Sequence, residues 1–464
     1  MKNSVRLIAF YLPQYHPIPE NDLWWGKGFT DWTNVARAHP LFPGHYQPHV
    51  PADLGFYDLR LPEIRDAQAT LAGEYGIYGF CYYHYWFHGR RFLERTFAAV
   101  LASGKPVFPF CLCWTNDSWS KRWKGQKDIL IAQQHSDEDD ILFIRALLPA
   151  FRDPRYITVE GRPLFIVYNT GTFPDAAKTA AVWRDCVRAA GLPGIYLVRA
   201  ETHTAYGTHP DPTAMGFDAA LEFPPNGIRS RQLKPDDLHW ISDSDCSLFD
   251  YREVMMHSIN RPTPTYKLFR GVMPSWDNTP RRQKGASIFL HSSPELYQRW
   301  LAECIRWTRQ QHSGDEQMIF INGWNEWAEG CHLEPDLRYG SQFLKATLNA
   351  LHQYEQPTTF VGNHGGHPNV HVPPDSCDTD LSEQASAMLR NHLSSQVQLR
   401  DAYLALQRIS SEQQKELSEI KSTLGWRVLS GYWRGVQKVF PEGTRRRRAF
   451  DALFSVLKSQ GVRG

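Results

Sequence analysis

Residues 6–17 read RLIAFYLPQYHP, and this stretch distinguishes between two architectures for the fold. The run from residue 6 to residue 12 is apolar and of strand length, which is typical of a strand buried on both faces of a parallel sheet. An open doubly wound sheet that binds a nucleotide normally continues with a G-x-G-x-x-G turn. Here the chain continues PQYHP instead. The sequence therefore favours a barrel over a Rossmann fold.

Apolar runs of the same kind recur along the chain, and helical patterns separate them. The seven further runs span residues 76–83, 107–114, 163–168, 195–199, 217–223, 269–276 and 317–324. Helices are expected between them, among others over residues 62–74, 136–151, 175–190 and 293–311. Eight strand–helix units within about 350 residues predict an α/β protein with a (β/α)8 TIM barrel and long inserted loops.

Bulk composition narrows the class of protein. Of the 464 residues, 42% are hydrophobic and 22% are charged, which excludes a disordered or fibrous chain. No stretch approaches the ~20 apolar residues of a membrane-spanning helix, and the first residues lack the apolar segment of a signal peptide. The eight cysteines are scattered, and no Cys/His group has zinc spacing. These features predict a reduced, cytoplasmic protein with no metal and no cofactor.

The composition changes after residue 354, which predicts a separate C-terminal part. We expect the barrel domain over residues 1–355, a linker rich in Pro, Gly and His over 356–380, and a helical, basic, amphipathic tail over 381–464. Residues 421–464 carry ten basic and two acidic side chains interspersed with Trp and Phe. This mixture fits a helix that lies on an anionic membrane surface, a basic partner-binding helix or a disordered terminus. Nucleic acid is not expected, because no reading module accompanies the charge.

The strongest chemical signal is the stretch INGWNEWAEG at residues 321–330, where the eighth predicted strand ends. In barrels, residues just past the carboxyl end of a strand line the active site. Glu326 and Glu329 are three positions apart and can present both carboxylates to one pocket. Glycoside cleavage needs such a pair, because one group protonates the leaving oxygen while the other activates or stabilises the attacking partner. The alternative is a helix-capping residue beside a solvated one, the ordinary meaning of an isolated E-x-x-E.

Polar and aromatic residues follow several other predicted strands, and together they indicate a sugar-binding mouth. Each is weak evidence alone: a histidine such as His84 is more often a core residue, and the alternative for the Trp-rich stretch at 24–32 is a packed lid. The expected substrate contacts are Tyr11, Gln14, His16, Trp24, Trp25, Trp32, Tyr83, His84, Trp114, Asn116, Asp117, Glu222, Trp276, Asp277, Asn278, Trp324 and Asn325.

Five motifs resemble those of the WbsX-type glycosyltransferase family, whose barrel is similar to glycoside hydrolase family 99. They are AFYLPQYHPIPEN (9–21), WWGKGFTDWTNV (24–35), GFCYYHYWF (79–87), WDNT (276–279) and WNEWAEG (324–330). The resemblance covers roughly residues 5–354 and implies a TIM barrel. Family 99 contains retaining endo-α-mannosidases and mannanases. By that resemblance Glu326 acts as base on the sugar 2-hydroxyl, giving a 1,2-anhydro sugar, while Glu329 protonates the leaving group, and no metal is implied.

Three functions are compatible with these features. The first is a glycosyltransferase of bacterial surface-polysaccharide (O-antigen, lipopolysaccharide or capsule) biosynthesis, which acts on an oligo- or polysaccharide, with a lipid-linked glycan at the cytoplasmic membrane face as the expected substrate. The second is a retaining endo-acting glycoside hydrolase with the same carboxylates, and the third is a non-catalytic glycan-binding barrel. The missing signal peptide favours the transferase. The lack of an obvious nucleotide motif beside the glutamates favours the hydrolase.

Overall fold

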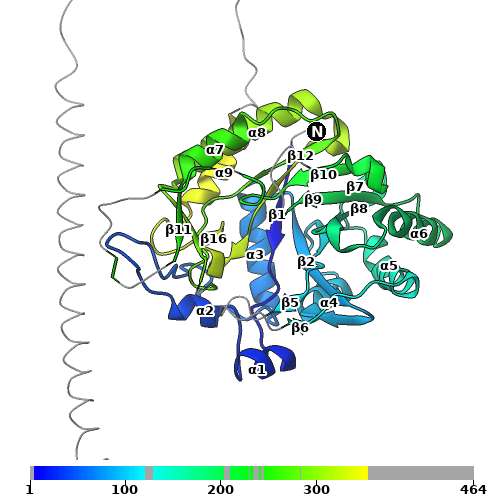
Figure 1. The fold of residues 1–464 in the computed structure, drawn as a ribbon, viewed down its shortest axis with the longest axis horizontal. Helices are drawn as coiled ribbons and strands as arrows, with labels where there is room; N and C mark the ends of the chain where they lie inside the picture. Colours follow the sequence, from blue (N-terminus) through cyan, green and yellow to red (C-terminus); the bar gives the residue numbers. More distant parts are fainter. Residues whose placement is uncertain are drawn as a thin grey trace, which may run out of the picture. The chain divides into compact units, whose positions relative to one another are not determined.

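A computed structural model describes residues 5–120, 129–202, 209–228, 230–233, 240–241, 245–282 and 284–353 of the chain. Eight parallel strands close into a barrel in the order β1-β2-β4-β8-β9-β10-β12-β14 (Figure 1). Closure is complete because β1 pairs with β14 on one side and with β2 on the other. The predicted (β/α)8 barrel is therefore confirmed. The predicted linker and tail lie outside the described residues.

Every barrel strand overlaps one of the eight runs that the sequence predicted. The barrel strands are β1 (Arg6–Tyr11), β2 (Gly79–Phe87), β4 (Phe110–Trp114), β8 (Arg162–Val167), β9 (Tyr196–Glu201), β10 (Ala219–Glu222), β12 (Leu268–Val272) and β14 (Met318–Ile321). Shorter strands lie outside the barrel order given above: β3 (Arg90–Phe92), β5 (Trp119–Ser120), β6 (Ile129–Ile131), β7 (Thr158–Val159), β11 (Ser247–Asp250), β13 (Ser287–Leu290), β15 (Asn325–Glu326) and β16 (Cys331–His332).

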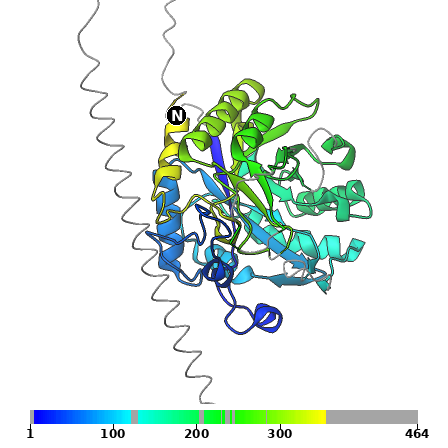
Figure 2. The same ribbon diagram turned by 60° about the vertical axis from the view of Figure 1, so that its left-hand side comes forward.

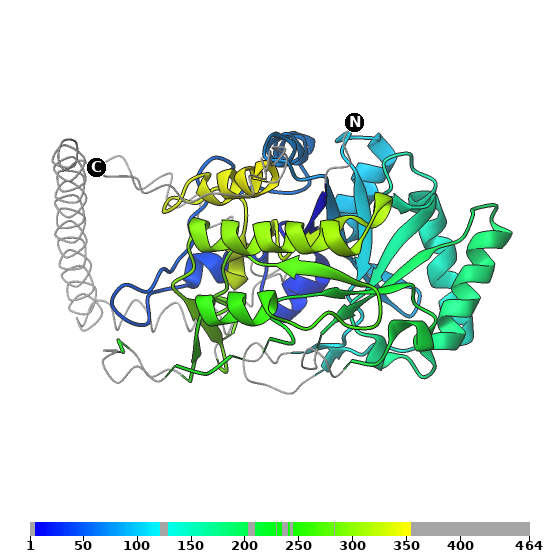
Figure 3. The same cartoon turned by 90° about the horizontal axis from the view of Figure 1, so that it is seen from above.

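Helices surround the strands, as Figures 2 and 3 show. They are α3 (Pro62–Glu74), α4 (Glu94–Ser103), α5 (Asp137–Phe151), α6 (Ala176–Ala189), α7 (Tyr251–Ile259), α8 (Pro294–Gln311) and α9 (Gln342–His352), with α1 (Pro19–Trp25) and α2 (Trp32–Arg37) in the loop after β1. The four predicted helices are observed to within one residue at each end. Ser136, Asp175 and Ser293 fix three of these starts, because each side-chain oxygen accepts the backbone N–H three residues later.

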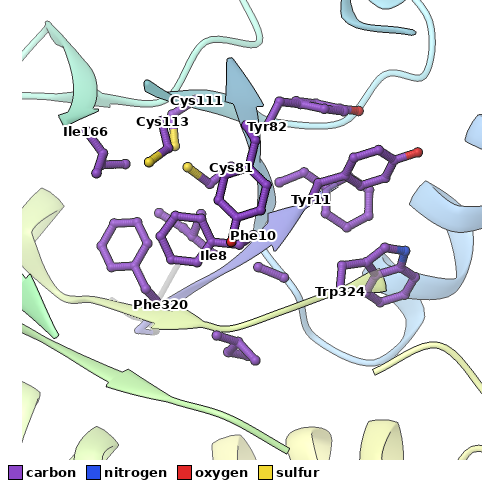
Figure 4. Close-up of a cluster of buried hydrophobic side chains, with 14 of the residues drawn as sticks. Ile8, Phe10, Tyr11, Cys81, Tyr82, Cys111, Cys113, Ile166, Phe320 and Trp324 are labelled. Carbon is purple, nitrogen blue, oxygen red and sulfur yellow. The ribbon is translucent and has the colours of Figure 1, made fainter. Parts of the chain in front are cut away.

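Side chains alternate between the interior of the barrel and its helix-facing side. The Phe10 ring lies inside, where it contacts Tyr83, Phe223 and Phe320. The next side chain, Tyr11, points the opposite way and donates a hydrogen bond to Gln68 of α3. Figure 4 shows this division, with Phe10 and Phe320 on one side of β1 and Tyr11 and Trp324 on the other. Residues paired in a parallel ladder share a side, so this alternation decides which predicted site residues reach the interior.

Among the described residues, none of the helices combines the length and the apolar character that crossing a membrane requires.

Candidate active site

One arginine brings the two predicted catalytic glutamates together. After β14 the chain passes through β15 and the 3-10 turn η5 (Trp327–Glu329), which carry Glu326 and Glu329. The Arg281 guanidinium contacts both: Nη2 lies 2.9 Å from Glu326 Oε2, and Nη1 lies 2.8 Å from Glu329 Oε1. Nη2 also lies 2.7 Å from Asp31 Oδ2. The structure therefore places both glutamates in one group, with an arginine and a third carboxylate that were not among the predicted contacts.

Among the described residues, the ion pairs of this group join three carboxyls to one guanidinium, so these pairs alone do not balance the charges. Burial raises the pKa of Glu326 to about 8, and the neighbouring carboxylates add to the rise while Arg281 opposes it. Burial likewise raises the pKa of Glu329, again against the effect of Arg281. Carboxyls coupled in this way titrate as a pair. We expect the pair to keep one proton near neutral pH, the state in which one carboxyl is an acid and the other a base.

The two glutamates differ in access. The Glu326 side chain is 5% exposed, whereas the Glu329 side chain is 20% exposed. Their hydrogen bonds and ion pairs with Arg281 each use a single carboxyl oxygen, Oε2 of Glu326 and Oε1 of Glu329. Arg281 thus contacts Oε2 of Glu326 and Oε1 of Glu329.

The turn that carries the glutamates is fixed by its own polar side chains. Asn325 Oδ1 accepts the backbone N–H of Leu12 at 2.7 Å, and Asn325 Nδ2 donates to the Leu12 carbonyl at 3.0 Å. The Trp327 indole N–H donates to Glu334 Oε2 at 2.7 Å, and its ring stacks on His332 at 3.7 Å. Asn325 and Trp327 therefore act in positioning, since their polar atoms bind the protein itself.

The loop after β12 supports the same turn and delivers Arg281. The backbone N–H of Asp277 donates to the Glu329 carbonyl at 2.7 Å. Gly330 has a φ of +55°, and a Cβ there would lie 3.1 Å from the N, Cβ and O atoms of Asp277. The Asp277 carboxylate is itself occupied by His45 and Gln47, each at 2.7 Å. Asp277 thus fixes the loop against the glutamate turn.

Four aromatic residues, Phe10, Tyr83, Tyr168 and Phe223, form a floor inside the barrel beneath the glutamates. Phe223 contacts Phe10 at 4.8 Å and Tyr168 at 5.2 Å, and Phe10 stacks on Tyr83 at 5.6 Å. Burial, and then the charge on Glu326, raises the pKa of Tyr83. Of this aromatic floor, only Tyr83 was among the predicted contacts.

Five predicted contacts face the helices instead of the glutamates, because of strand alternation. Tyr11 binds Gln68, and Trp324 packs on Phe80 at 5.2 Å. His84 and Trp114 both contact Phe143 of α5, with ring centroids 5.9 and 4.2 Å away. Glu222 forms ion pairs with Arg261 and Arg270 at 3.1 and 3.0 Å. We interpret all five as residues of the barrel–helix packing.

The remaining predicted contacts lie in loops, and most bind other loops. Asn116 exchanges hydrogen bonds with the Asn169 backbone, and Asp117 accepts from the Asn169 side chain at 2.7 Å. In the loop after β1, the Gln14 carbonyl accepts the Asp31 N–H and His16 is buried beside Thr96. The tryptophans of that loop pack on other aromatic rings: Trp24 on Phe92 and Trp119, Trp25 on Phe29, and Trp32 on Trp327. In the loop after β12, Trp276 is nearly buried and its carbonyl accepts the Phe289 N–H, while the Asn278 side chain accepts the Ser287 N–H. Gln14 and Trp32 thereby support Asp31 and the glutamate turn.

Solved structures with a similar fold include glycoside hydrolases. The GH99 endo-alpha-mannosidase from Bacteroides thetaiotaomicron matches 75% of this chain and 97% of its own, with a TM-score of 0.48 and 14% identity. A glycoside hydrolase-like protein matches 75% of this chain and 94% of its own, with a TM-score of 0.47 and 15% identity.

Sequence comparison gives a more specific result. The WxcX proteins from two strains of Xanthomonas campestris pv. campestris are 46% identical to this chain over 353 residues, which cover 74% of this chain and 49% of each relative. The chain thus spans about half the length of these curated relatives. A family model described as Glycosyltransferase WbsX matches residues 7–347, which contain all five motifs. The chain therefore belongs to the WbsX glycosyltransferase family of carbohydrate-active enzymes.

Proposed function

We propose that this protein transfers glycosyl groups in bacterial surface-polysaccharide biosynthesis, with Glu326 and Glu329 as its acid–base pair. The observation that carries the proposal is the shared contact of both carboxyls with Arg281. Two carboxyls with raised pKa values at the carboxyl ends of barrel strands are the arrangement that glycosidic-bond chemistry needs. Family membership supports a saccharide as the substrate.

In the proposed reaction the two glutamates exchange protons with the substrate in two steps and return to their starting state. The reactive microstate of the coupled pair carries the shared proton on Glu329, although burial favours the proton on Glu326; in this microstate ionised Glu326 removes the proton of the sugar 2-hydroxyl, and O2 attacks the anomeric carbon as the glycosidic bond breaks. Glu329 gives its proton to the leaving oxygen, which leaves a 1,2-anhydro sugar. The more exposed position of Glu329 suits contact with the leaving group. In the second step Glu329 takes a proton from the incoming hydroxyl, and Glu326 returns one to O2.

The incoming hydroxyl decides between the two catalytic candidates. A glycan hydroxyl, for which we propose a lipid-linked acceptor at the cytoplasmic membrane face, makes the protein a transferase, whereas water makes it a retaining endo-acting hydrolase. The observation that favours the hydrolase is the acid–base pair itself, since it is suited to cleaving an existing glycosidic bond. A glycan-binding barrel without catalysis is the third candidate.

Product analysis distinguishes these candidates. Purified protein is incubated with α-mannan oligosaccharides and, in a separate reaction, with nucleotide sugars plus a lipid-linked acceptor. Lengthened acceptor identifies a transferase, and shortened oligosaccharide identifies a hydrolase. If neither substrate is consumed but glycan binding is measured, the catalytic proposal fails.

Glutamine variants test the assignment of the two residues. We expect Glu326→Gln and Glu329→Gln each to lower the rate by ~10²-fold or more, because glutamine neither gives nor takes the proton. At acidic pH, where Glu326 is protonated in the wild type, thermal stability should remain close to that of the wild type. Glu74→Gln is the matched control, because Glu74 is exposed at the end of α3, where the chain enters the opposite end of the barrel. A wild-type rate in either glutamate variant contradicts the assignment.

A further inference from the structure

A second cluster of ionisable side chains lies behind the glutamate turn and takes no part in the chemistry proposed above. It consists of His49, His332 and Asp336, all of them buried. His49 Nδ1 lies 2.8 Å from His332 Nε2, and His332 Nε2 lies 3.8 Å from Asp336 Oδ2. One potential ligand atom from each residue lies within 4.8 Å of the other two. Two imidazoles and a carboxylate thus converge on one point.

The hydrogen bonds around the cluster orient its atoms for coordination. His332 Nδ1 lies 2.9 Å from the Glu334 carbonyl oxygen, which only accepts, so the proton is on Nδ1 and the Nε2 lone pair faces His49 and Asp336. Histidines that bind metals commonly donate their other N–H to a carbonyl in this way. Asp336 Oδ1 accepts the backbone N–H groups of Arg338 and Tyr339 at 2.9 and 2.6 Å. Its Oδ2 atom is the one directed at His332.

The hydroxyl of Tyr46 is buried beside the cluster. The Tyr46 ring stacks on His49 at 4.1 Å, and burial, followed by the Asp336 carboxylate, raises the pKa of Tyr46. Among the described residues, however, no hydrogen-bond partner in good geometry is found for the Tyr46 hydroxyl. Buried polar groups are nearly always paired, often with water. A water bound to a metal at this position would pair with that hydroxyl.

We propose that His49, His332 and Asp336 bind a divalent transition-metal ion. Two neutral imidazoles and one carboxylate with a water in the fourth position match the ligand preference of Zn²⁺. The ion would join residues 46–51 to the segment that follows the glutamate turn, where Pro51 already forms a bridge with Asp336. Its role is structural, because His332 supports the Trp327 ring and that ring lies in the turn carrying both glutamates.

The test is Zn²⁺ binding to the full chain after treatment with EDTA, followed by titration calorimetry with zinc chloride and by metal analysis of the dialysed protein. Residues 356–380 also contain histidines, so the comparison between variants decides the outcome and not the total amount of zinc. Asp336→Asn keeps the oxygen that accepts the two backbone N–H groups but removes the anionic ligand. Asp211→Asn is the matched control, because Asp211 Oδ1 makes a similar bond to the Thr213 N–H on the surface.

We expect the wild type and Asp211→Asn to bind one more Zn²⁺ per chain than His332→Gln. For Asp336→Asn we expect binding at this site to weaken at least ~10-fold, as losses in metal coordination shells generally do. Thermal unfolding with and without zinc provides a second measurement, since a ligand that binds only the folded state raises the unfolding temperature. Equal stoichiometry and affinity in all four proteins would overturn the proposal, leaving a hydrogen bond from His49 to His332.

Discussion

Replacing Arg281 by methionine tests the electrostatics of the glutamate pair. The substitution keeps an unbranched side chain but removes the cation that contacts Asp31, Glu326 and Glu329 at 2.7, 2.9 and 2.8 Å. The Arg281 side chain is only 8% exposed, so solvent does not replace it. Leaving buried charges without their partner costs about 3–5 kcal/mol of unfolding free energy. We expect a loss in this range at pH 8.

The stability lost in Arg281→Met should depend on pH. Arg281 lowers the pKa of Glu326, so without it the value rises above about 8. A carboxyl whose pKa is raised by folding binds its proton more tightly in the folded state, and the folded state therefore loses stability as pH rises from the unfolded value toward the folded one. The variant should consequently lose less stability at pH 5.5, where protonation relieves the repulsion. The pH optimum of any activity should move to higher pH, because the base ionises later.

Urea unfolding at the two pH values, together with a pH–rate profile, measures both effects. Arg282→Met is the comparison variant, because Arg282 is the exposed neighbour in the sequence and its charge acts on Glu329 more weakly than that of Arg281. Arg281→Lys retains the charge and should recover part of the stability. If Arg281→Met and Arg282→Met lose the same stability at pH 8 and at pH 5.5, the reasoning about the charge group is refuted.

Further predictions concern the pair, the turn and the tail. The wild-type free energy of unfolding should fall as pH rises from 4.5 to about 8, by at most a few kcal/mol, and Glu326→Gln should flatten that slope in pH-dependent urea unfolding. Gly330→Ala should destabilise more than Gly340→Ala by ~1–3 kcal/mol, because both have a positive φ but only the first Cβ meets backbone atoms; equal losses would contradict this. Full-length protein should sediment with anionic liposomes at low salt through residues 421–464, whereas a chain ending near Tyr354 should not; if neither protein binds liposomes, the tail is better explained by a protein partner.

The sequence predicted the strands well because a parallel barrel buries both faces of each strand. Such strands appear as continuous apolar runs, and all eight were located. Because neither face of such a strand is polar, the sequence does not indicate which side chains point into the barrel and which point toward the helices. His84, Trp114 and Glu222 were therefore expected at the mouth, although they face the helices. A residue count along the strand from an established interior position such as Phe10 would have separated the two sides.

The two glutamates of the proposed acid–base pair were predictable from local sequence, but their partners were not. Glu326 and Glu329 lie in one motif at a strand end. Arg281 is 45 positions before Glu326, and Asp31 is 250 positions before Arg281. A buried group of carboxylates requires a cation, so the chemistry predicts that one exists. The three-dimensional structure is needed to identify Arg281 as that cation.

Closure of the barrel also determines when, during synthesis, the glutamate turn reaches its final position. The side chain of Asn325 forms two hydrogen bonds with the backbone of Leu12, 313 positions earlier. Strand β1 pairs with β14 only when β14, the last barrel strand, has formed. Contacts so distant in sequence form late and slowly. During synthesis the glutamate turn leaves the ribosome after all the strands that support it. A chain still attached to the ribosome before that point lacks the closed barrel that positions Glu326 and Glu329, so the paired carboxyls are in place only in molecules whose barrel is complete.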